Sequence, residues 1–500
     1  MGARGRFGRR GLAVVGIAMA GLVVLGGTAL ARSSGPPGRW DVVAQGRGVP
    51  GNSANDLGLA RTADGALHVA WSEQTSPSAE AIRQRKISAA GALGATTTIA
   101  AGWTGVSDPD LVVDRRGQLR AFFGGQRSLQ QNELLTGLMS ALSPDGGASW
   151  IYEPVYNQNF VGASRTPSVT VASDGTTLQS WYGASEIWVH RGLDPGAPSR
   201  LFAADARLSE FGPTVVRDAA GRIWVSWCAF GSGPGGVYLR RGDVATGAPT
   251  TAPVRLPGSA TPFGGKQYST CNLERTAARR TPMVARVGGG VFVAGSAGYP
   301  TLSRVLVWRI DASGRIPGGA FVVGADGAFG HQTPMLAAAP DGRVWVAWLE
   351  ARPGRAMIAA RRSNRAGTEW GEPVRVRAPG AWLLGALNIA AQAGKLDVLG
   401  LMHTVSGVNS IQHTQLLPGL TLARAGTVTR PNGSVTLSFR VTDAGDPVAG
   451  ARVSAAGRGA EVTGANGIVT FVGAATESVT LRLTASKSGY VDDQLAVRCC

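Results

Sequence analysis

One pattern recurs seven times along this chain: a short apolar run, a turn that contains Gly, and a second apolar run that often closes on Trp. Apolar residues alternate with period two on both sides of the Gly, as in a β-hairpin. A repeat of roughly 50 residues built from such hairpins is typical of β-propeller blades. The copies occupy residues 60–71, 112–123, 171–182, 216–227, 285–295, 338–348 and 390–400.

A second pair of strands follows most of these hairpins, so each unit is expected to be a four-stranded sheet. The seventh unit lacks its last strand, whereas residues 40–45 (WDVVAQ) supply a spare one before the first hairpin. Pairing the two would close a ring and remove an open sheet edge. The sequence therefore predicts an all-β, seven-bladed propeller over residues 40–415, with six blades and an irregular hairpin as the alternative.

The pattern changes near residue 420 to shorter alternating strands without Trp, which predicts a separate β-sandwich over residues 420–500. This part resembles the Ig-like and carboxypeptidase-regulatory-like modules of bacterial surface proteins. The matching motifs are Pro447 to Val453, Asn466-Gly467 and Lys487 to Tyr490. The resemblance implies a spacer or adhesive role.

The first 31 residues have the features of a signal peptide: four early arginines, an apolar stretch and an Ala-Leu-Ala exit at Ala29 to Ala31. An uncleaved membrane anchor is the alternative. Residues 32–39 are expected to be a linker. The protein is therefore expected to be secreted or attached to the cell envelope.

The chain is basic, with a formal net charge of +17. Such a surface favours acidic partners, here an extracellular glycan or an acidic surface polymer. No basic run is interleaved with aromatic residues, which argues against nucleic acid. No metal-ligand spacing or phosphate loop stands out, so we expect no cofactor and no metal, and we expect a monomer.

Two cysteines are expected to lie near one face. Cys228 follows the Trp that closes the fourth hairpin, and Cys271 lies in the polar, Gly-rich insertion of residues 258–280. A disulfide between them suits an exported chain, and two free thiols are the alternative. Long polar connections on a rigid scaffold often carry function.

Residues 143–150 read SPDGGASW and match the Asp-box pattern of sialidase-like propellers, which this chain resembles. The aspartate is expected to bond turn amides, the second glycine to adopt an unusual φ and the tryptophan to pack beneath. The resemblance implies a structural role. A degenerate copy, SNRAGTEW, spans 363–370 with Arg365 in place of the aspartate. The box residues are Ser143, Asp145, Gly147, Ser149 and Trp150.

A second resemblance concerns the Arg-Ile-Pro frame of sialidases. The sixth repeat fits this frame from its Pro to Glu350, but Gln332 replaces the Arg. The Arg is present in Arg165-Thr166-Pro167 and Arg280-Thr281-Pro282. An inner strand begins where its hairpin partner ends, so residues at strand entries and strand exits share one face of the ring.

In a sialidase-like site, arginines hold a carboxylate, a Tyr activated by a Glu is the nucleophile and an Asp is the general acid. Each candidate has a structural alternative: the arginines and glutamates as rim salt-bridge partners, Tyr182 as packing, and His331 as a hydrogen-bonded residue. The catalytic candidates are Glu73, Glu350, Tyr182 and Asp108, and the ligand-binding candidates are Arg165, Arg280, His331 and Gln332.

Only two of the three arginines that a sialidase uses can be placed, and no Tyr-Glu pair can be assigned. The first hypothesis is therefore a non-catalytic module that binds a glycan or surface ligand. The second is an exo-acting, sialidase-like glycoside hydrolase that acts on acidic sugars.

Overall fold

The computed structural model describes residues 39–49, 57–126, 136–157, 165–183, 185–194, 196–263, 266–269, 280–298, 301–325, 330–352, 355–379, 382–403, 408–431, 434–474 and 479–499. Every regular element in these residues is a β-strand, and they contain no helix that is long and apolar enough to cross a membrane. The predicted signal peptide, Cys271 and Cys500 lie outside the described residues.

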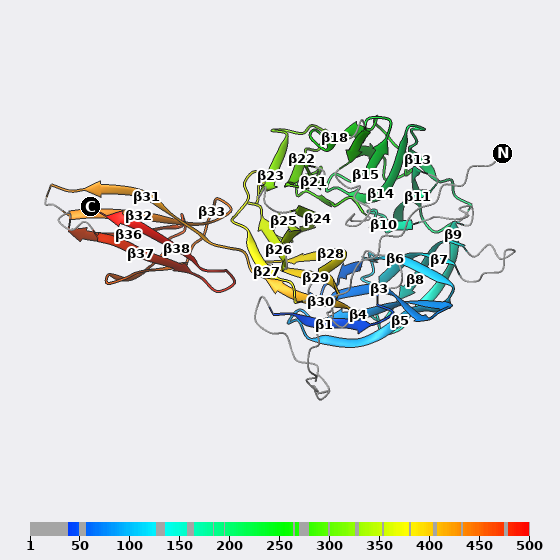
Figure 1. Cartoon of the computed structure of the whole chain (residues 1–500), viewed down its shortest axis with the longest axis horizontal. Helices are drawn as coiled ribbons and strands as arrows, with labels where there is room; N and C mark the ends of the chain where they lie inside the picture. Colours follow the sequence, from blue (N-terminus) through cyan, green and yellow to red (C-terminus); the bar gives the residue numbers. More distant parts are fainter. Residues whose placement is uncertain are drawn as a thin grey trace, which may run out of the picture. The chain divides into compact units, whose positions relative to one another are not determined.

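Seven antiparallel sheets follow one another in the described part of residues 39–416 (Figure 1). Six have four strands, and the fourth carries an extra hairpin from the insertion. The first sheet is β2 (Gly58–Arg61), β3 (Leu67–Ser76), β4 (Ala79–Ile87) and β5 (Leu93–Trp103); the second is β6 (Gly105–Val113), β7 (Leu119–Gln126), β8 (Thr136–Ser143) and β9 (Ile151–Asn157); the third is β10 (Arg165–Val171), β11 (Thr177–Gly183), β12 (Glu186–Arg191) and β13 (Arg200–Ala203). The fourth is β14 (Leu208–Arg217), β15 (Ile223–Gly231), β16 (Gly236–Gly242) and β17 (Val254–Arg255), with the extra hairpin β18 (Ala260–Phe263) and β19 (Lys266–Ser269). The fifth is β20 (Met283–Ala285), β21 (Val291–Ala297), β22 (Arg304–Ile310) and β23 (Ala320–Gly324); the sixth is β24 (Gly330–Ala338), β25 (Val344–Arg352), β26 (Arg355–Arg362) and β27 (Val374–Arg377); the seventh is β28 (Trp382–Gln392), β29 (Lys395–His403), β30 (Asn409–Leu416) and β1 (Asp41–Gly46).

All seven predicted hairpins are confirmed, each as the first two strands of its sheet. The turn glycine of each copy has a positive φ, for example 80° at Gly65 and 77° at Gly117. Glycine adopts this left-handed conformation at no steric cost, which is why each turn can reverse the chain so tightly.

The predicted ring closure is also seen. The strand β1 pairs antiparallel with β30, so the start of the described chain completes the seventh sheet. Each inner strand contacts the inner strand of the next sheet, and β28 of the seventh sheet contacts β2 of the first. The sheets therefore form a closed ring, which is the arrangement of a β-propeller.

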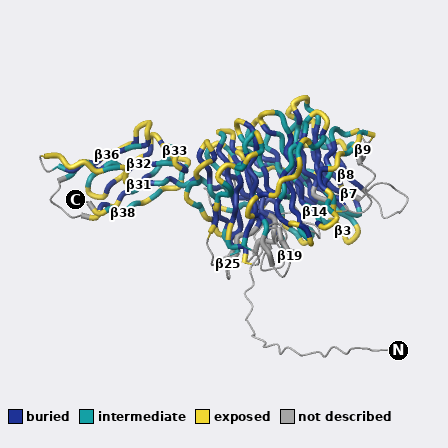
Figure 2. The backbone as a smooth tube through the Cα atoms, turned by 90° about the horizontal axis from the view of Figure 1, so that it is seen from above, coloured by how far each residue is buried: buried dark blue, intermediate teal, exposed yellow. Residues whose placement is uncertain are grey.

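The core of the ring lies between neighbouring sheets (Figure 2). One cluster, for example, joins Trp345 of the sixth sheet to Val398 of the seventh. The tryptophans that close the repeats are fully buried in such clusters, as expected from their place at the end of an inner hairpin. They include Trp71, Trp181, Trp227 and Trp348, and Trp345 within the sixth repeat is buried in the same way.

A buried polar network joins the first and last sheets. Asp397 on β29 lies 2.5 Å from Arg61 Nη2 on β2 and 2.8 Å from His413 Nε2 on β30. Burial raises the pKa of Asp397, but the hydrogen bond and charge of His413 and the charge of Arg61 outweigh this and lower it overall. The network therefore holds a carboxylate at the seam where the ring closes.

The C-terminal part is a sandwich of two sheets around its own core, which includes Phe439, Val441 and Leu481. Residues Ser33–Cys500 form one unit by their contacts. One sheet is β31 (Thr421–Thr429), β32 (Ser434–Asp443), β33 (Asp446–Pro447) and β36 (Ile468–Ala474); the other is β34 (Arg452–Ala455), β35 (Gly459–Val462), β37 (Val479–Ser486) and β38 (Asp493–Cys499).

Replacing Asp397 tests the seam. We expect Asp397→Asn to lower the free energy of unfolding by about 3–5 kcal/mol at pH 7, because Arg61 would lose its buried counter-charge. Urea unfolding would measure this, beside the exposed control Asp492→Asn, expected to change it by less than about 0.5 kcal/mol. A loss for Asp397→Asn no larger than that of the control would contradict a role for this network in holding the ring closed.

Candidate functional site

Strand entries and strand exits share one face of the ring, as predicted. In the strand register, Arg165 lies opposite Tyr182 and His331 lies opposite Glu350. We call this side, where the inner strands begin, the entry face. It is the side on which nearly all the candidate site residues were expected.

A proline lies within four of the seven inner strands near this face and directly precedes a fifth. Four of these strands have a register shift around the proline, because proline has no N–H to give to the ladder. Two residues that precede such a proline, Asp108 and Thr333, have positive φ values of 51° and 46°, a strained conformation for a side chain other than glycine. The five prolines are Pro109, Pro167, Pro213, Pro282 and Pro334.

The guanidinium of Arg280 reaches the second sheet from the start of the fifth. Its Nη2 donates to the carbonyl oxygens of Asp108 (3.2 Å) and Pro109 (2.9 Å), and its Nη1 lies 3.2 Å from Asp110 Oδ1. In ring order the third and fourth sheets lie between these two sheets. The predicted clamp Arg280 thus bridges the entry face and is joined there to Asp108, another predicted site residue.

Asp110 is the hub of this bridge, and the sequence analysis missed it. Its Oδ1 accepts from the amide of Leu111 (3.0 Å) and its Oδ2 from the amide of Val169 (2.8 Å), so it joins the second, third and fifth sheets. Burial raises the pKa of Asp110, while the charge of Arg280 and the two amides act against that rise. The carboxyl would be costly to bury without the arginine.

Two predicted catalytic carboxylates pair with arginines of their own sheets. Arg375 Nε donates to both carboxylate oxygens of the buried Glu350, at 3.2 Å to Oε1 and 3.1 Å to Oε2. Glu73 Oε2 lies 2.9 Å from Arg83 Nε. These contacts match the salt-bridge alternative for both glutamates, although neither partner is Arg165 or Arg280.

The other candidates are placed as follows. Tyr182 is half-buried and packs against the core between the third and fourth sheets, and Asp108 is fully buried. For Arg165, His331 and Gln332 the structure describes the backbone, and their side chains lie outside its described part.

The residues of SPDGGASW form the hydrogen-bonded turn that the motif predicts, between β8 and β9. Asp145 Oδ1 accepts from Ser149 N and Ser143 Oγ, both at 2.9 Å, and Gly147 has a φ of 92°. The hydrogen bonds from Ser149 hold the pKa of Asp145 at about 2. Since strands alternate in direction, this turn lies at the opposite side from the entry face, and Trp150 packs against the core between the first and second sheets.

Cys228 is disulfide-bonded, and its Sγ lies 3.0 Å from Thr281 Oγ1. Its predicted partner, Cys271, is outside the described residues. The hydrogen bond between Cys228 Sγ and Thr281 places this sulfur near Arg280, the residue before Thr281, at the junction of the fourth and fifth sheets.

The buried carboxyl of Glu210 on β14 is the second residue that the sequence analysis missed. Its Oε1 accepts from Trp227 Nε1 at 3.0 Å, and Oε2 has no hydrogen-bond partner in the part of the chain that the structure describes. Burial raises the pKa of Glu210 to about 7. Tyr238 stacks on Trp227, with 5.7 Å between ring centroids. The one sequence signal is a Glu within the otherwise apolar start of an inner strand.

Among the described residues, no cluster of His, Cys, Asp or Glu could hold a metal ion. The described part of the entry face has three notable features: strained backbone at Asp108 and Thr333, the bridging Arg280, and the carboxyl of Glu210, whose pKa is about 7. A group with such a pKa near a functional face is a candidate proton donor.

No protein-family model and no curated protein matches this chain. Solved structures to which it is similar include an ulvan lyase, a polysaccharide lyase bound to -[GlcA(1-4)Rha3S]- (13% identity, 75% of this chain, 95% of the other, TM-score 0.44). A second is a Penicillium chrysogenum α-L-arabinanase complexed with arabinobiose (13% identity, 76% of this chain, 99% of the other, TM-score 0.42). A third is the NanB sialidase from Streptococcus pneumoniae (8% identity, 62% of this chain, 67% of the other, TM-score 0.40).

Replacing Arg280 distinguishes a structural bridge from a free ligand clamp. We expect Arg280→Gln to lower the free energy of unfolding by about 3–5 kcal/mol at pH 8, because Asp110 would remain buried without its counter-charge. The loss should be smaller at pH 5 than at pH 8, because burial raises the pKa of Asp110 and lower pH favours the neutral carboxyl, which needs no counter-charge. Urea unfolding at both values would show this, with Arg315→Gln, an exposed arginine paired with Asp311, as a control expected to cost about 0–1 kcal/mol. A fully stable Arg280→Gln variant would mean that the bridge contributes nothing to stability.

The pKa of Glu210 predicts a pH-dependent stability. Because its folded-state pKa is raised above the unfolded value, its contribution is full below about pH 4 and is lost as pH rises through about 7. From pH 5 to pH 8 we expect wild type to lose roughly 2–3 kcal/mol relative to Glu210→Gln, which cannot ionise. Urea unfolding at the two pH values measures this. The exposed control Glu461→Gln should follow wild type, and parallel profiles for wild type and Glu210→Gln would refute the assignment.

Proposed function

We propose that this protein is an exported, seven-bladed, sialidase-like propeller with a C-terminal Ig-like module, and that it binds an extracellular glycan or an acidic surface polymer without cleaving it. Each of the seven sheets would be one blade. The entry face would be the binding surface.

The bridge formed by Arg280 carries the non-catalytic assignment. Bidentate capture of a sugar carboxylate needs guanidinium donors that face the ligand. Arg280 instead directs donors to Asp110 and to the carbonyls of Asp108 and Pro109. Glu73 and Glu350 are likewise paired with arginines. Among the described residues, Arg280 therefore bridges two sheets, and both glutamates are paired within their own sheets.

An acidic partner is supported by charge. The chain carries 49 Lys and Arg against 32 Asp and Glu. A positive surface attracts polyanions over distances of about a Debye length, roughly 8–10 Å at physiological salt. Binding of this kind should weaken as salt concentration rises.

Glu210 favours a second candidate, an exo-acting glycoside hydrolase on acidic sugars. A carboxyl with a pKa of about 7 can remain protonated at neutral pH and donate that proton to a leaving glycosidic oxygen. Water would then supply the hydroxyl to the other product. In this case Glu210, rather than Glu73 or Glu350, would be the general acid.

The test uses the protein without its first 31 residues, on an array of acidic and neutral glycans and with a panel of fluorogenic glycosides that includes sialosides. We expect salt-sensitive binding to acidic glycans and no release of the fluorophore. Arg165→Gln, at the entry face, should weaken binding about tenfold or more, because one charged hydrogen-bonding group would be lost.

The matched control is Arg315→Gln, because Arg315 follows the end of β22 on the opposite side of the ring from the entry face. It should leave binding unchanged. Absence of binding to any glycan would overturn the proposal. Turnover that Glu210→Gln abolishes would establish the hydrolase instead.

A further inference from the structure

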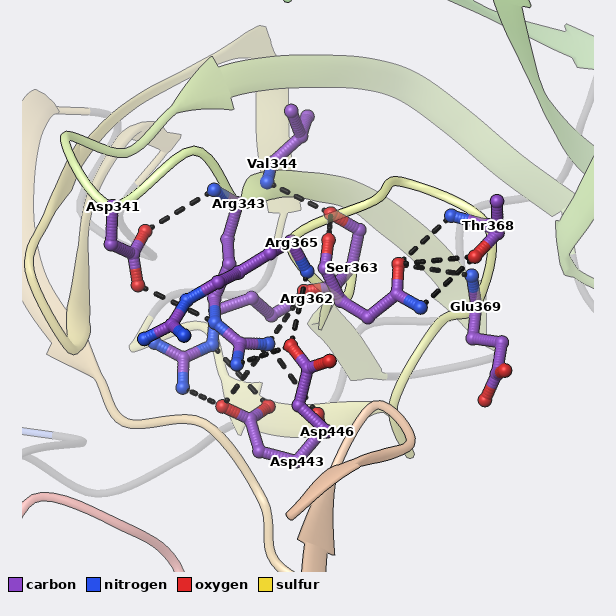
Figure 3. A network of polar contacts seen from close by, with 11 residues as sticks. Asp341, Arg343, Val344, Arg362, Ser363, Arg365, Thr368, Glu369, Asp443 and Asp446 are labelled. Carbon is purple, nitrogen blue, oxygen red and sulfur yellow. Dashed lines mark hydrogen bonds and ion pairs between the residues drawn. The ribbon is translucent and has the colours of Figure 1, made fainter. Parts of the chain in front are cut away.

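A turn of the C-terminal sandwich lies against the sixth sheet of the ring (Figure 3). The turn joins β32 to β33 and is formed by Asp443 to Asp446, which pair with each other across it. It meets the loop between β26 and β27, which contains the degenerate motif SNRAGTEW. Neither feature has a part in the function proposed above.

The degenerate motif still forms an ordered turn, with another residue in the role of the missing aspartate. Asn364 Oδ1 accepts from the amides of Thr368 (2.9 Å) and Glu369 (3.3 Å). Arg365, at the position of the aspartate, is therefore not needed inside the turn. Its amide donates instead to Asp446 Oδ2 of the sandwich, at 3.1 Å.

Arg362 joins the two parts through charge and ring contacts. Its guanidinium binds the carboxylate of Asp443, and both side chains are about 97% buried or more. The same guanidinium lies 5.5 Å from the ring centroid of Trp345 in the sixth sheet and 5.7 Å from that of Tyr490 in the sandwich. Cation–π attraction therefore links this arginine to one aromatic ring of each part.

Arg343 adds a second buried cation to the contact. Its Nη2 lies 2.6 Å from Asp446 Oδ2, its Nη1 3.6 Å from Asp443 Oδ2 and its Nε 3.4 Å from Asp341 Oδ2. The ring thus supplies both arginines, and the sandwich supplies two of the three aspartates. Neither set of buried charges is balanced without the other part.

The tip of the sandwich turn fits the loop closely. Ala444 is buried and lies against Gly371, and a side chain at Gly445 would overlap the carboxylate of Glu369. Ala444 and Gly445 have φ values of 52° and 89°, as in the two-residue turns that join antiparallel strands. The turn therefore makes contact through both shape and charge.

We propose that the altered turn of residues 363–370, together with Arg343 and Arg362, is a docking site for the C-terminal sandwich. The sandwich is then a structural partner of the sixth sheet and not a tethered spacer. Tyr490, from the Lys-x-Gly-Tyr motif, closes the contact over Arg362. This proposal does not depend on the ligand or on catalysis.

The distribution of tryptophan allows a direct test in the full chain. All 13 Trp residues precede residue 417, so Trp fluorescence reports unfolding of the ring alone. We expect Asp443→Asn, a change in the sandwich, to lower the midpoint of the thermal Trp transition by about 5 °C, because Arg362 would remain buried without its counter-charge. The control Asp492→Asn, an exposed aspartate of the same sandwich, should leave the midpoint within about 1 °C.

A second variant covers the case in which Asp443→Asn does not fold. Tyr490→Ala keeps every ion pair and removes one of the two rings beside Arg362, so we expect a smaller decrease of the Trp midpoint, about 2 °C. Limited proteolysis of the connection at residues 417–420 gives an independent readout: resistant in wild type and cut faster in either variant. Unchanged Trp midpoints in the folded variants, or rapid cleavage of wild type there, would overturn the proposal.

Discussion

Closure of the ring is the constraint on which the rest of this structure depends. Each hydrophobic cluster of the ring lies between two neighbouring sheets, so no sheet can bury its faces alone. The pairing of β1 with β30 completes the seventh sheet and brings residues some 370 positions apart into one ladder. The first and seventh sheets then meet through β2 and β28. Asp397 strengthens this seam by holding Arg61 and His413 together. An open seam would expose two apolar sheet faces.

Closure also determines what the entry face can do. It brings the proline-containing entries of the inner strands close enough for Arg280 to span the distance to Asp110. The interruptions free backbone carbonyls from the ladders, and those of Asp108 and Pro109 then accept from the arginine. Arg280, which could bind an anionic ligand, instead joins the second and fifth sheets at this face. Among the described residues of this face, Glu210 could still donate a proton, because its pKa is raised and only one of its two carboxyl oxygens accepts a hydrogen bond.

The local pattern was enough to predict the hairpins, their glycine turns and the strand that closes the ring, because period-two alternation and glycine act over a few residues. The same reasoning placed these strand entries and exits on one face, and the register then sets Arg165 opposite Tyr182 and His331 opposite Glu350. It missed Asp110 and Glu210. The roles of Asp110 and Glu210 depend on burial and on partners in other sheets or on the neighbouring strand. Such pairings cannot be recognised from the sequence positions of the two residues alone.

The degenerate motif at residues 363–370 shows how a mismatch to a family pattern can report a new contact. Loss of the aspartate at Arg365 would be read as decay of a structural turn. Asn364 keeps the turn closed, however, and the acidic groups needed next to the exchanged site come from Asp443 and Asp446. Because Arg362 is buried against Asp443 and Arg343 is paired with Asp446, loss of either aspartate would leave a buried arginine without a counter-charge from the sandwich. The turn thus lacks the one carboxylate of the motif and is contacted by two from the sandwich, Asp443 and Asp446. These contacts couple the stability of the ring to that of the sandwich.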